Sequence, residues 1–166
     1  MSTASTHPPL DLDPTPATPI VLGTMAWGSV PPPPPDADPG ARPEGPAGAA
    51  QAEAAVERAR RALRAGIEAG VDLLDTADIY GAGRSEETVG RLLHELPYEE
   101  RSALKVQTKC GIVLHETDPA GRRLTRYDSS PEHVRASLEG SLARLGEQRV
   151  DTLIIHRPDV LTPVAD

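Results

Sequence analysis

A carboxylate, a phenol, an ammonium and an imidazole each fall at the end of a short apolar segment or just after one. In chain order they are Asp75, Tyr80, Lys109 and His156. Polar groups at the carboxyl ends of parallel strands lie where parallel-sheet folds build their active sites. Because side chains alternate along a strand, Asp75, Lys109 and His156 can share one face of a sheet.

Such a set of groups suits proton transfer. A phenol with an ordinary pKa of about 10 is a poor acid at neutral pH, and a nearby ammonium favours the phenolate and lowers that pKa. A buried lysine needs a counter-ion, which Asp75 can supply, and a neutral imidazole can orient a carbonyl or share the proton. This chemistry would make Tyr80 a general acid, a role typically worth about 10²–10⁴ in rate.

Each of the four residues also has a purely structural interpretation. Asp75 could cap a helix or a loop, and Tyr80 could be a packed aromatic residue with a hydrogen-bonded hydroxyl. Lys109 could be half of a structural ion pair, and His156 could be a hydrogen-bonded histidine at a strand end. Perturbed groups are often structural, so the functional hypothesis depends on all four falling at the same end of successive strands.

The elements that must position these residues alternate along the chain. A short apolar run ended by a turn signal predicts a strand at 20–22, and further strands are predicted at 71–75, 104–109 and 150–155. Apolar residues at helical spacing predict helices between them, at 49–69, from the expected N-cap Ser85 to residue 96, and at 131–145. A polar loop is expected at 115–128. The alternating order predicts an α/β fold with a parallel sheet covered by helices.

Two architectures fit this order, a doubly wound open sheet and a (β/α)8 barrel. The segment Gly81-Ala82-Gly83 is the nearest match to a dinucleotide-binding fingerprint, but it follows a loop and lacks the third glycine at the proper spacing. The periodicity of the chain therefore leaves the choice between the two open.

Composition narrows the class of protein. The net charge of -8 argues against sequence-independent binding to nucleic acid. No run approaches the roughly 20 apolar residues of a membrane span, and residues 1–13 have neither the basic nor the apolar segment of a signal peptide. A single cysteine, Cys110, cannot form an internal disulfide. Together these features favour a soluble cytoplasmic protein.

Proline is concentrated near the start of the chain, where 13 of the 18 prolines lie within the first 50 residues. Such segments lack the apolar groups that would offset the entropy of ordering. We therefore expect a disordered tail at 1–18 and a disordered or polyproline-like insertion at about 29–50, within a domain that spans 19–166.

The segment from Gly70 to Gly81, followed by Ser85-Glu86-Glu87 and Gly90, resembles the second-strand signature of the aldo-keto reductases. Lys109, within 107–111, is similar to the lysine on their third strand. The segments 127–130, 141–145 and 151–156 look like their third helix and fourth strand, and Arg157-Pro158-Asp159 resembles a bacterial subgroup of the superfamily.

The resemblance implies a (β/α)8 barrel of which this chain holds the first four βα units, a half-barrel. It implies that Asp75, Tyr80, Lys109 and His156 form a catalytic tetrad. Hydride would pass from a reduced nicotinamide, usually NADPH with NADH as the alternative, to the carbonyl carbon of a small-molecule aldehyde or ketone. Tyr80 would donate the proton to the carbonyl oxygen.

The resemblance also implies binding residues. Gly23, Thr24 and Met25, together with Asp75, match positions beside the nicotinamide ribose, and Trp27 lies where such enzymes often line the substrate pocket. For Trp27 a packing role at the edge of the core is nearly as well supported. No metal site is expected, since the remaining histidines and the cysteine show no ligand spacing.

The chain stops after the fourth predicted strand, whereas the resemblance puts the sites for the nicotinamide amide, the pyrophosphate and the adenosine 2′-phosphate on later strands. Two hypotheses follow. The chain is part of a carbonyl oxidoreductase, or it is a non-catalytic half-barrel fragment or partner subunit. A half-barrel leaves two strand edges exposed, which predicts self-association.

Overall fold

The computed structural model describes residues 20–29, 45–117 and 123–157. The predicted tail at 1–18 lies outside the described residues, as does the greater part of the predicted insertion. No helix within the described ranges is long and apolar enough to cross a bilayer.

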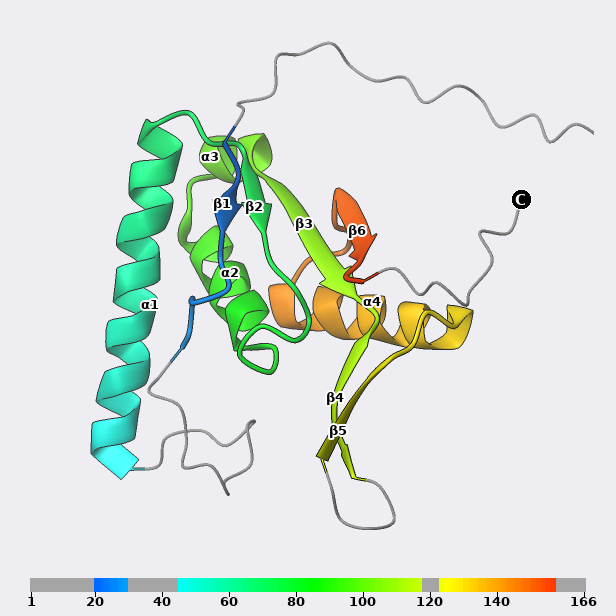
Figure 1. Ribbon diagram of the computed structural model, residues 1–166. Coiled ribbons are helices and arrows are strands. Elements are labelled where there is room, and N and C mark those ends of the chain that lie inside the picture. Colours follow the sequence, from blue (N-terminus) through cyan, green and yellow to red (C-terminus); the bar gives the residue numbers. More distant parts are fainter. Residues whose placement is uncertain (1–19, 30–44, 118–122, 158–166) are drawn as a thin grey trace, which may run out of the picture.

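Four parallel strands form the central sheet, in the order in which they occur along the chain (Figure 1). They are β1 (Leu22–Gly23), β2 (Leu73–Asp75), β3 (Lys105–Cys110) and β6 (Thr152–Ile155). Each strand is parallel to its neighbour. The predicted alternation of strands and crossover helices is confirmed, with strand ends that differ by one or two residues.

Helices α1 (Gly45–Glu68), α2 (Arg84–Glu95) and α4 (Pro131–Leu145) connect the strands, and the short α3 (Tyr98–Ala103) follows α2. They cover one face of the sheet, because strand residues and helix residues share one buried cluster. Its members from the sheet include Leu74 and Val106, and those from the helices are Ala59, Leu63, Val89, Leu92, Leu93 and Leu145.

The register of the strands places the predicted site residues on the other face. Gly23 pairs with Asp75, and Asp75 pairs with Gln107. Lys109, two residues further along β3, pairs with Ile154. Directly paired residues of parallel strands point to the same side of the sheet, so these side chains all face away from the helices.

The start of the first predicted helix is wrong, and one short helix was not predicted. Helix α1 begins at Gly45, inside the predicted insertion at 29–50. Alanines between 47 and 55 are strong helix formers, and Pro46 is tolerated because the first turn does not need its missing N–H. The six-residue helix α3 was not anticipated either, although Pro97 does end α2 as expected.

The predicted polar loop at 115–128 is also wrong in large part. The chain there forms an antiparallel hairpin of β4 (Ile112–Thr117) and β5 (Arg123–Tyr127) with a shifted register. β-branched residues such as Ile112, Val113 and Thr125 favour extended backbone. The hairpin projects beyond the carboxyl end of β3 (Figure 1), so it lies on the side of the sheet edge where the site is expected.

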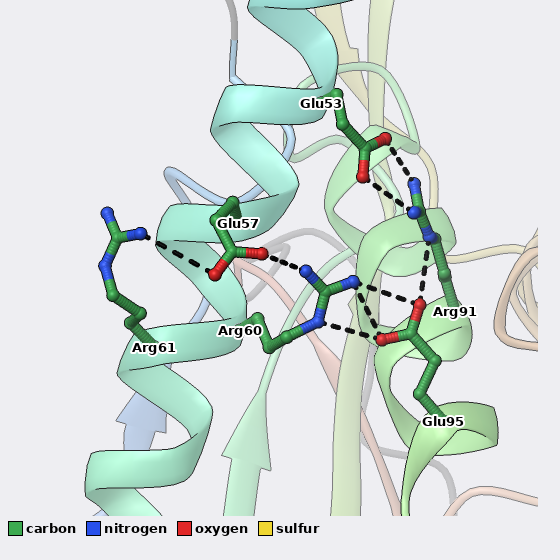
Figure 2. A network of polar contacts seen from close by, with 6 residues as sticks. All are labelled: Glu53, Glu57, Arg60, Arg61, Arg91 and Glu95. Carbon is green, nitrogen blue, oxygen red and sulfur yellow. Dashed lines mark hydrogen bonds and ion pairs between the residues drawn. The ribbon is translucent and has the colours of Figure 1, made fainter.

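Ion pairs join the outer surfaces of α1 and α2 (Figure 2). Arg60 of α1 contacts Glu95 of α2 at 2.8 Å, and Arg91 of α2 contacts Glu53 of α1 at 2.8 Å. Bonding to Arg91 lowers the pKa of Glu53. Because these groups are largely exposed, the network contributes modestly to stability and mainly fixes how the two helices lie against each other.

Candidate active site

Three of the four predicted site residues meet around one ammonium group. Lys109 Nζ lies 2.8 Å from Asp75 Oδ2 and 3.2 Å from the Tyr80 hydroxyl oxygen. It also donates to the backbone carbonyl of Thr76 at 2.8 Å. The Lys109 side chain is only 13% exposed, so three oxygen atoms replace most of the water that the ammonium loses on burial.

Asp75 is held by a residue that the sequence did not single out. Its second oxygen, Oδ1, accepts a hydrogen bond from Gln107 Nε2 at 2.7 Å. Gln107 lies two residues before Lys109 on β3 and therefore points to the same side of the sheet. That spacing was visible in the sequence, but a glutamine carries no chemistry of its own to mark it as part of a site.

His156 completes the group from the next strand. Its ring lies edge-on to the Tyr80 ring, with the centroids 5.6 Å apart and the planes at 83°. Its backbone N–H donates to the carbonyl of Cys110 at 2.8 Å, which continues the pairing of β3 with β6. Burial and then the charge of Lys109 lower the pKa of His156, so the imidazole is neutral at pH 7.

Tyr80 is carried by a tightly wound loop between β2 and α2. Its N–H donates to the carbonyl of Ala77 at 3.1 Å, and its own carbonyl accepts from the N–H of Ser85 at 3.2 Å. The three residues after Tyr80 all have left-handed φ angles, including 54° at Ala82, which is not a glycine. A run of this kind is costly for non-glycine residues and persists only where the surroundings fix it.

Three buried hydroxyl groups tie this loop to the end of β1. Ser85 Oγ lies 2.8 Å from Thr24 Oγ1 and 3.1 Å from Thr76 Oγ1, and Thr24 Oγ1 also donates to the carbonyl of Asp75 at 3.0 Å. All three residues are fully buried. The predicted N-cap role of Ser85 is wrong, because Gly83 occupies that position and the Ser85 hydroxyl is used in this cluster instead.

The predicted binding residues differ in how far they are open to a ligand. Met25 is 65% exposed, and nothing lies within 4 Å of the place where a Gly23 side chain would begin. Thr24 is fully buried in the hydroxyl cluster. Trp27 is 7% exposed and belongs to the core cluster, so the structure favours its packing role, and contact with substrate stays a prediction.

The loop that carries Tyr80 also holds a buried carboxyl group, that of Asp78. Burial and then the negative charge of Glu86 raise the pKa of Asp78 to about 6. Asp78 Oδ1 is buried without a hydrogen-bond partner. Burial, assisted by the charge of Asp78, also raises the pKa of the Cys110 thiol, which is free and fully buried. Cys110 is therefore a packing residue and not an activated nucleophile.

No group of three His, Cys, Asp or Glu side chains that could hold a metal ion occurs in the described ranges. The assembled groups are those of an acid–base site at the carboxyl ends of parallel strands. They bring a phenol, an ammonium, a carboxylate and a neutral imidazole from β2, its following loop, β3 and β6 to one place.

Comparison with known proteins bears on both the fold and the site. The sequence profile of the Aldo/keto reductase family matches residues 19–166. The 6-dehydroglucose reductase of Agrobacterium fabrum (strain C58 / ATCC 33970) is 40% identical over 103 residues, which is 60% of this chain and 33% of that protein. The NADH-specific methylglyoxal reductase of Escherichia coli (strain K12) is 38% identical over 104 residues, covering 58% of this chain and 31% of that protein.

A solved structure, the glycerol dehydrogenase of Gluconobacter oxydans, matches with a TM-score of 0.60 and 34% identity, over 86% of this chain and 36% of the other. The chain thus spans about a third of the length of these relatives. The match extends across the sheet and its helices and selects the barrel over the doubly wound sheet. This chain belongs to the aldo/keto reductase family of oxidoreductases, and its fold is part of a (β/α)8 barrel.

Proposed function

We propose that the site acts in the NADPH-dependent reduction of a small aldehyde or ketone, with Tyr80 as the proton donor. The observation that carries this proposal is the position of Lys109 Nζ, 2.8 Å from Asp75 and 3.2 Å from the Tyr80 hydroxyl. Reduction of a carbonyl adds hydride to carbon and a proton to oxygen. The described residues supply the proton and the charge that stabilises the group left behind.

Lys109 assists the transfer through its charge. When Tyr80 gives its proton to the carbonyl oxygen, a phenolate forms 3.2 Å from the ammonium, and the pair is stabilised in a half-buried place where water screens it weakly. Asp75 keeps the ammonium in position before the transfer takes place. The proton is then replaced from solvent, which returns Tyr80 to its starting state.

His156 is suited to positioning the carbonyl group of the substrate. Its ring meets the Tyr80 ring edge-on, and its lowered pKa keeps it uncharged. A neutral imidazole can hydrogen-bond a carbonyl oxygen without competing with Tyr80 as a strong acid. We assign His156 to orienting the carbonyl that Tyr80 protonates.

The nicotinamide end of the cofactor fits the open positions at the end of β1. Gly23 leaves space above the sheet beside Asp75, and Met25 offers an exposed apolar surface. A reduced nicotinamide bound there would supply the hydride. Thr24 contributes through its backbone and by holding Asp75, because its hydroxyl is already engaged.

The test is an NADPH-oxidation assay with a panel of small aldehydes and ketones, repeated with NADH. Tyr80→Phe should reduce turnover by about 10²–10⁴, the usual value of a positioned proton donor. Tyr98→Phe is the matched control, since Tyr98 is 80% exposed on α3 and far from the site in the fold. Equal turnover in the two variants, or no binding of either cofactor, would contradict the proposal.

A second candidate function, that of a non-catalytic partner subunit, is favoured by the two free edges of the sheet. Strands β1 and β6 are the two edges of the sheet and have no strand partner on their outer sides among the described residues. Large apolar side chains are exposed beside both edges, Ile20 and Val21 near β1 and Ile155 on β6. Free edges with apolar neighbours pair with other chains, so we propose that copies of the chain self-associate there.

Size-exclusion chromatography with light scattering tests this candidate. The mass should rise with protein concentration, and Ile155→Lys should suppress the rise because a charge on an edge strand opposes pairing. Leu124→Lys is the control, since Leu124 is 45% exposed on the β4–β5 hairpin, outside the main sheet. A monomer at every concentration with a cooperative melting transition would exclude self-association.

A further inference from the structure

A buried carboxylate that takes no part in the proposed reaction joins three elements behind the site. Glu86, in the first turn of α2, is fully buried. Its Oε1 accepts a hydrogen bond from Thr108 Oγ1 of β3 at 2.6 Å, and its Oε2 accepts from Arg144 Nε of α4 at 2.6 Å. Both oxygens of the carboxylate are therefore bonded, as a buried charge requires.

The contact to Thr108 bears on the site because Lys109 is the next residue of the strand. Side chains alternate along β3, so Thr108 points toward the helices and Lys109 toward the open face. Thr108 is fully buried. Fixing its hydroxyl against Glu86 limits rotation of the strand end about its own axis, and with it the direction in which the Lys109 side chain leaves the backbone.

The same turn of α2 also holds Tyr80. The N–H of Ser85, which directly precedes Glu86, donates to the Tyr80 carbonyl at 3.2 Å. The Arg144 side chain lies against Gly83 so closely that a Cβ on that glycine would meet Arg144 Cδ at 2.6 Å. The loop that carries Tyr80 is thus attached to α2 on one side and backed by Arg144 on the other.

We propose that Glu86 is a positioning residue that sets the distance between Lys109 and Tyr80. Ser85 and Glu86 are consecutive residues, and one holds the backbone of Tyr80 while the other holds the strand residue beside Lys109. The first turn of α2 therefore sets the distance between the Tyr80 hydroxyl and the Lys109 ammonium. The inference rests on the proposed function, for which it names the residue that holds the acid and the cation together.

The competing explanation is that Glu86 and Arg144 only fasten α2 to α4. If so, breaking the contact would lower the free energy of unfolding but would not make the Lys109 amine more reactive in the folded protein. The chain offers a direct readout of that amine, because it has only two lysines, Lys105 and Lys109. The side chain of Lys105 is 57% exposed and that of Lys109 is 13% exposed, so Lys105 serves as an internal reference.

The experiment measures acetylation of the two amines in the full 166-residue chain at low reagent concentration, with each site quantified by tandem mass spectrometry. Thr108→Val removes the hydroxyl at nearly constant volume, and Thr108→Ser restores it. In the Val variant the ratio of Lys109 to Lys105 labelling should rise about tenfold, the factor that a lost hydrogen bond to a charged group is worth. The Ser variant should keep the ratio of the original chain.

Leu145→Ala is the matched control for a general loss of packing. Leu145 is fully buried on α4 and belongs to the core, and the hydrogen bonds to the Glu86 carboxylate come from Thr108 and Arg144 instead. This variant should melt at a lower temperature and keep the original labelling ratio while folded. A ratio that rises as much in Leu145→Ala as in Thr108→Val would overturn the positioning role.

Glu86→Gln keeps the proposal testable if Thr108→Val does not fold. Its amide oxygen can still accept from Thr108, whereas its amide nitrogen faces the Arg144 donor, so the ratio should rise less than in Thr108→Val. An unchanged ratio in whichever of Thr108→Val and Glu86→Gln folds would overturn the inference. That result would leave the proton-donor role intact, because the Tyr80→Phe assay tests it separately.

Discussion

Replacing Gly90, in the middle of α2, by alanine should destabilise the fold, although the same change usually stabilises a helix. In an exposed helix interior, alanine is more favourable than glycine by about 0.5–1 kcal/mol. At Gly90, however, a Cβ would lie 2.4 Å from the carbonyl oxygen of Leu145 and 2.8 Å from its Cα. These are backbone atoms of α4, so no side-chain rotation can relieve the contact.

The size of the effect follows from that geometry. The contact of 2.4 Å would have to lengthen to between 3.0 and 3.4 Å, so α2 and α4 would have to separate by about 0.6–1 Å, and overpacking of this kind typically costs about 1–3 kcal/mol. Set against the gain in helix propensity, Gly90→Ala should lower the free energy of unfolding by about 1–2 kcal/mol. With a urea dependence of about 1–3 kcal/mol per molar, the midpoint should fall by roughly 0.5–1 M.

The assay is urea unfolding followed by circular dichroism at one fixed protein concentration, since self-association would shift the midpoint. Gly140→Ala on α4 is the matched control. The three nearest atoms to a Cβ there all belong to the Arg144 guanidinium, the closest at 3.1 Å, so a shift of a few tenths of an ångström in that side chain relieves the contact without any movement of the backbone. Gly140→Ala should therefore be neutral or stabilising by up to about 1 kcal/mol. Equal gains in both variants would refute the close approach of α2 to α4.

Three further predictions concern two buried groups near the site and one ion pair on the outer surfaces of α1 and α2. Burial and the charge of Glu86 raise the pKa of Asp78 from 3.8 to about 6, so ionisation of this carboxyl lowers the free energy of unfolding as the pH rises from about 4 to about 6. Asp78→Asn should lack this loss of stability when urea unfolding is measured across that pH range. A variant with the same pH dependence as the original chain would contradict the prediction. Thr24→Val removes a buried hydroxyl bonded to Asp75 and Ser85 and should lower the free energy of unfolding by about 1–3 kcal/mol. An unchanged midpoint of urea unfolding would show that stability does not depend on the hydroxyl cluster. Glu95→Gln weakens the exposed ion pair with Arg60 and should lower the melting temperature slightly at low salt. The difference from the original chain should disappear at high salt, which thermal melts at two salt concentrations will test.

The face of the sheet that carries the site could be predicted from the sequence because alternation along a strand is local. Asp75 and Lys109 each end a predicted strand, and knowing which residues share a face needs no knowledge of the whole fold. The register of β2 with β3 agrees with that expectation. The choice of a barrel could not be made in this way, because it depends on how the whole sheet curves and closes.

Other features depend on contacts between distant segments. Ser85 has the residue type and position of a helix cap, but its hydroxyl bonds to Thr24, 61 residues earlier, which no local rule detects. Trp27 follows a site residue in sequence yet turns into the core. The β4–β5 hairpin was missed because the apolar run at 112–114 is short and is followed by polar residues, and because the shifted register of the hairpin depends on the pairing of two segments.

The site is assembled from segments that are neighbours both in sequence and in the sheet. Asp75 and Lys109 lie on adjacent strands, and the N–H of Asp78 donates to the Lys109 carbonyl at 3.1 Å, which joins the loop of Tyr80 to the end of β3. Among the described residues, the hydrogen bonds of the Lys109 ammonium go to Asp75, Thr76 and Tyr80. The proposed proton donor and its neighbouring ammonium are therefore held in place by β2, its loop and β3. Geometry of this kind does not depend on closing the barrel, so the ammonium–phenol contact should form wherever these strands and α2 pack together.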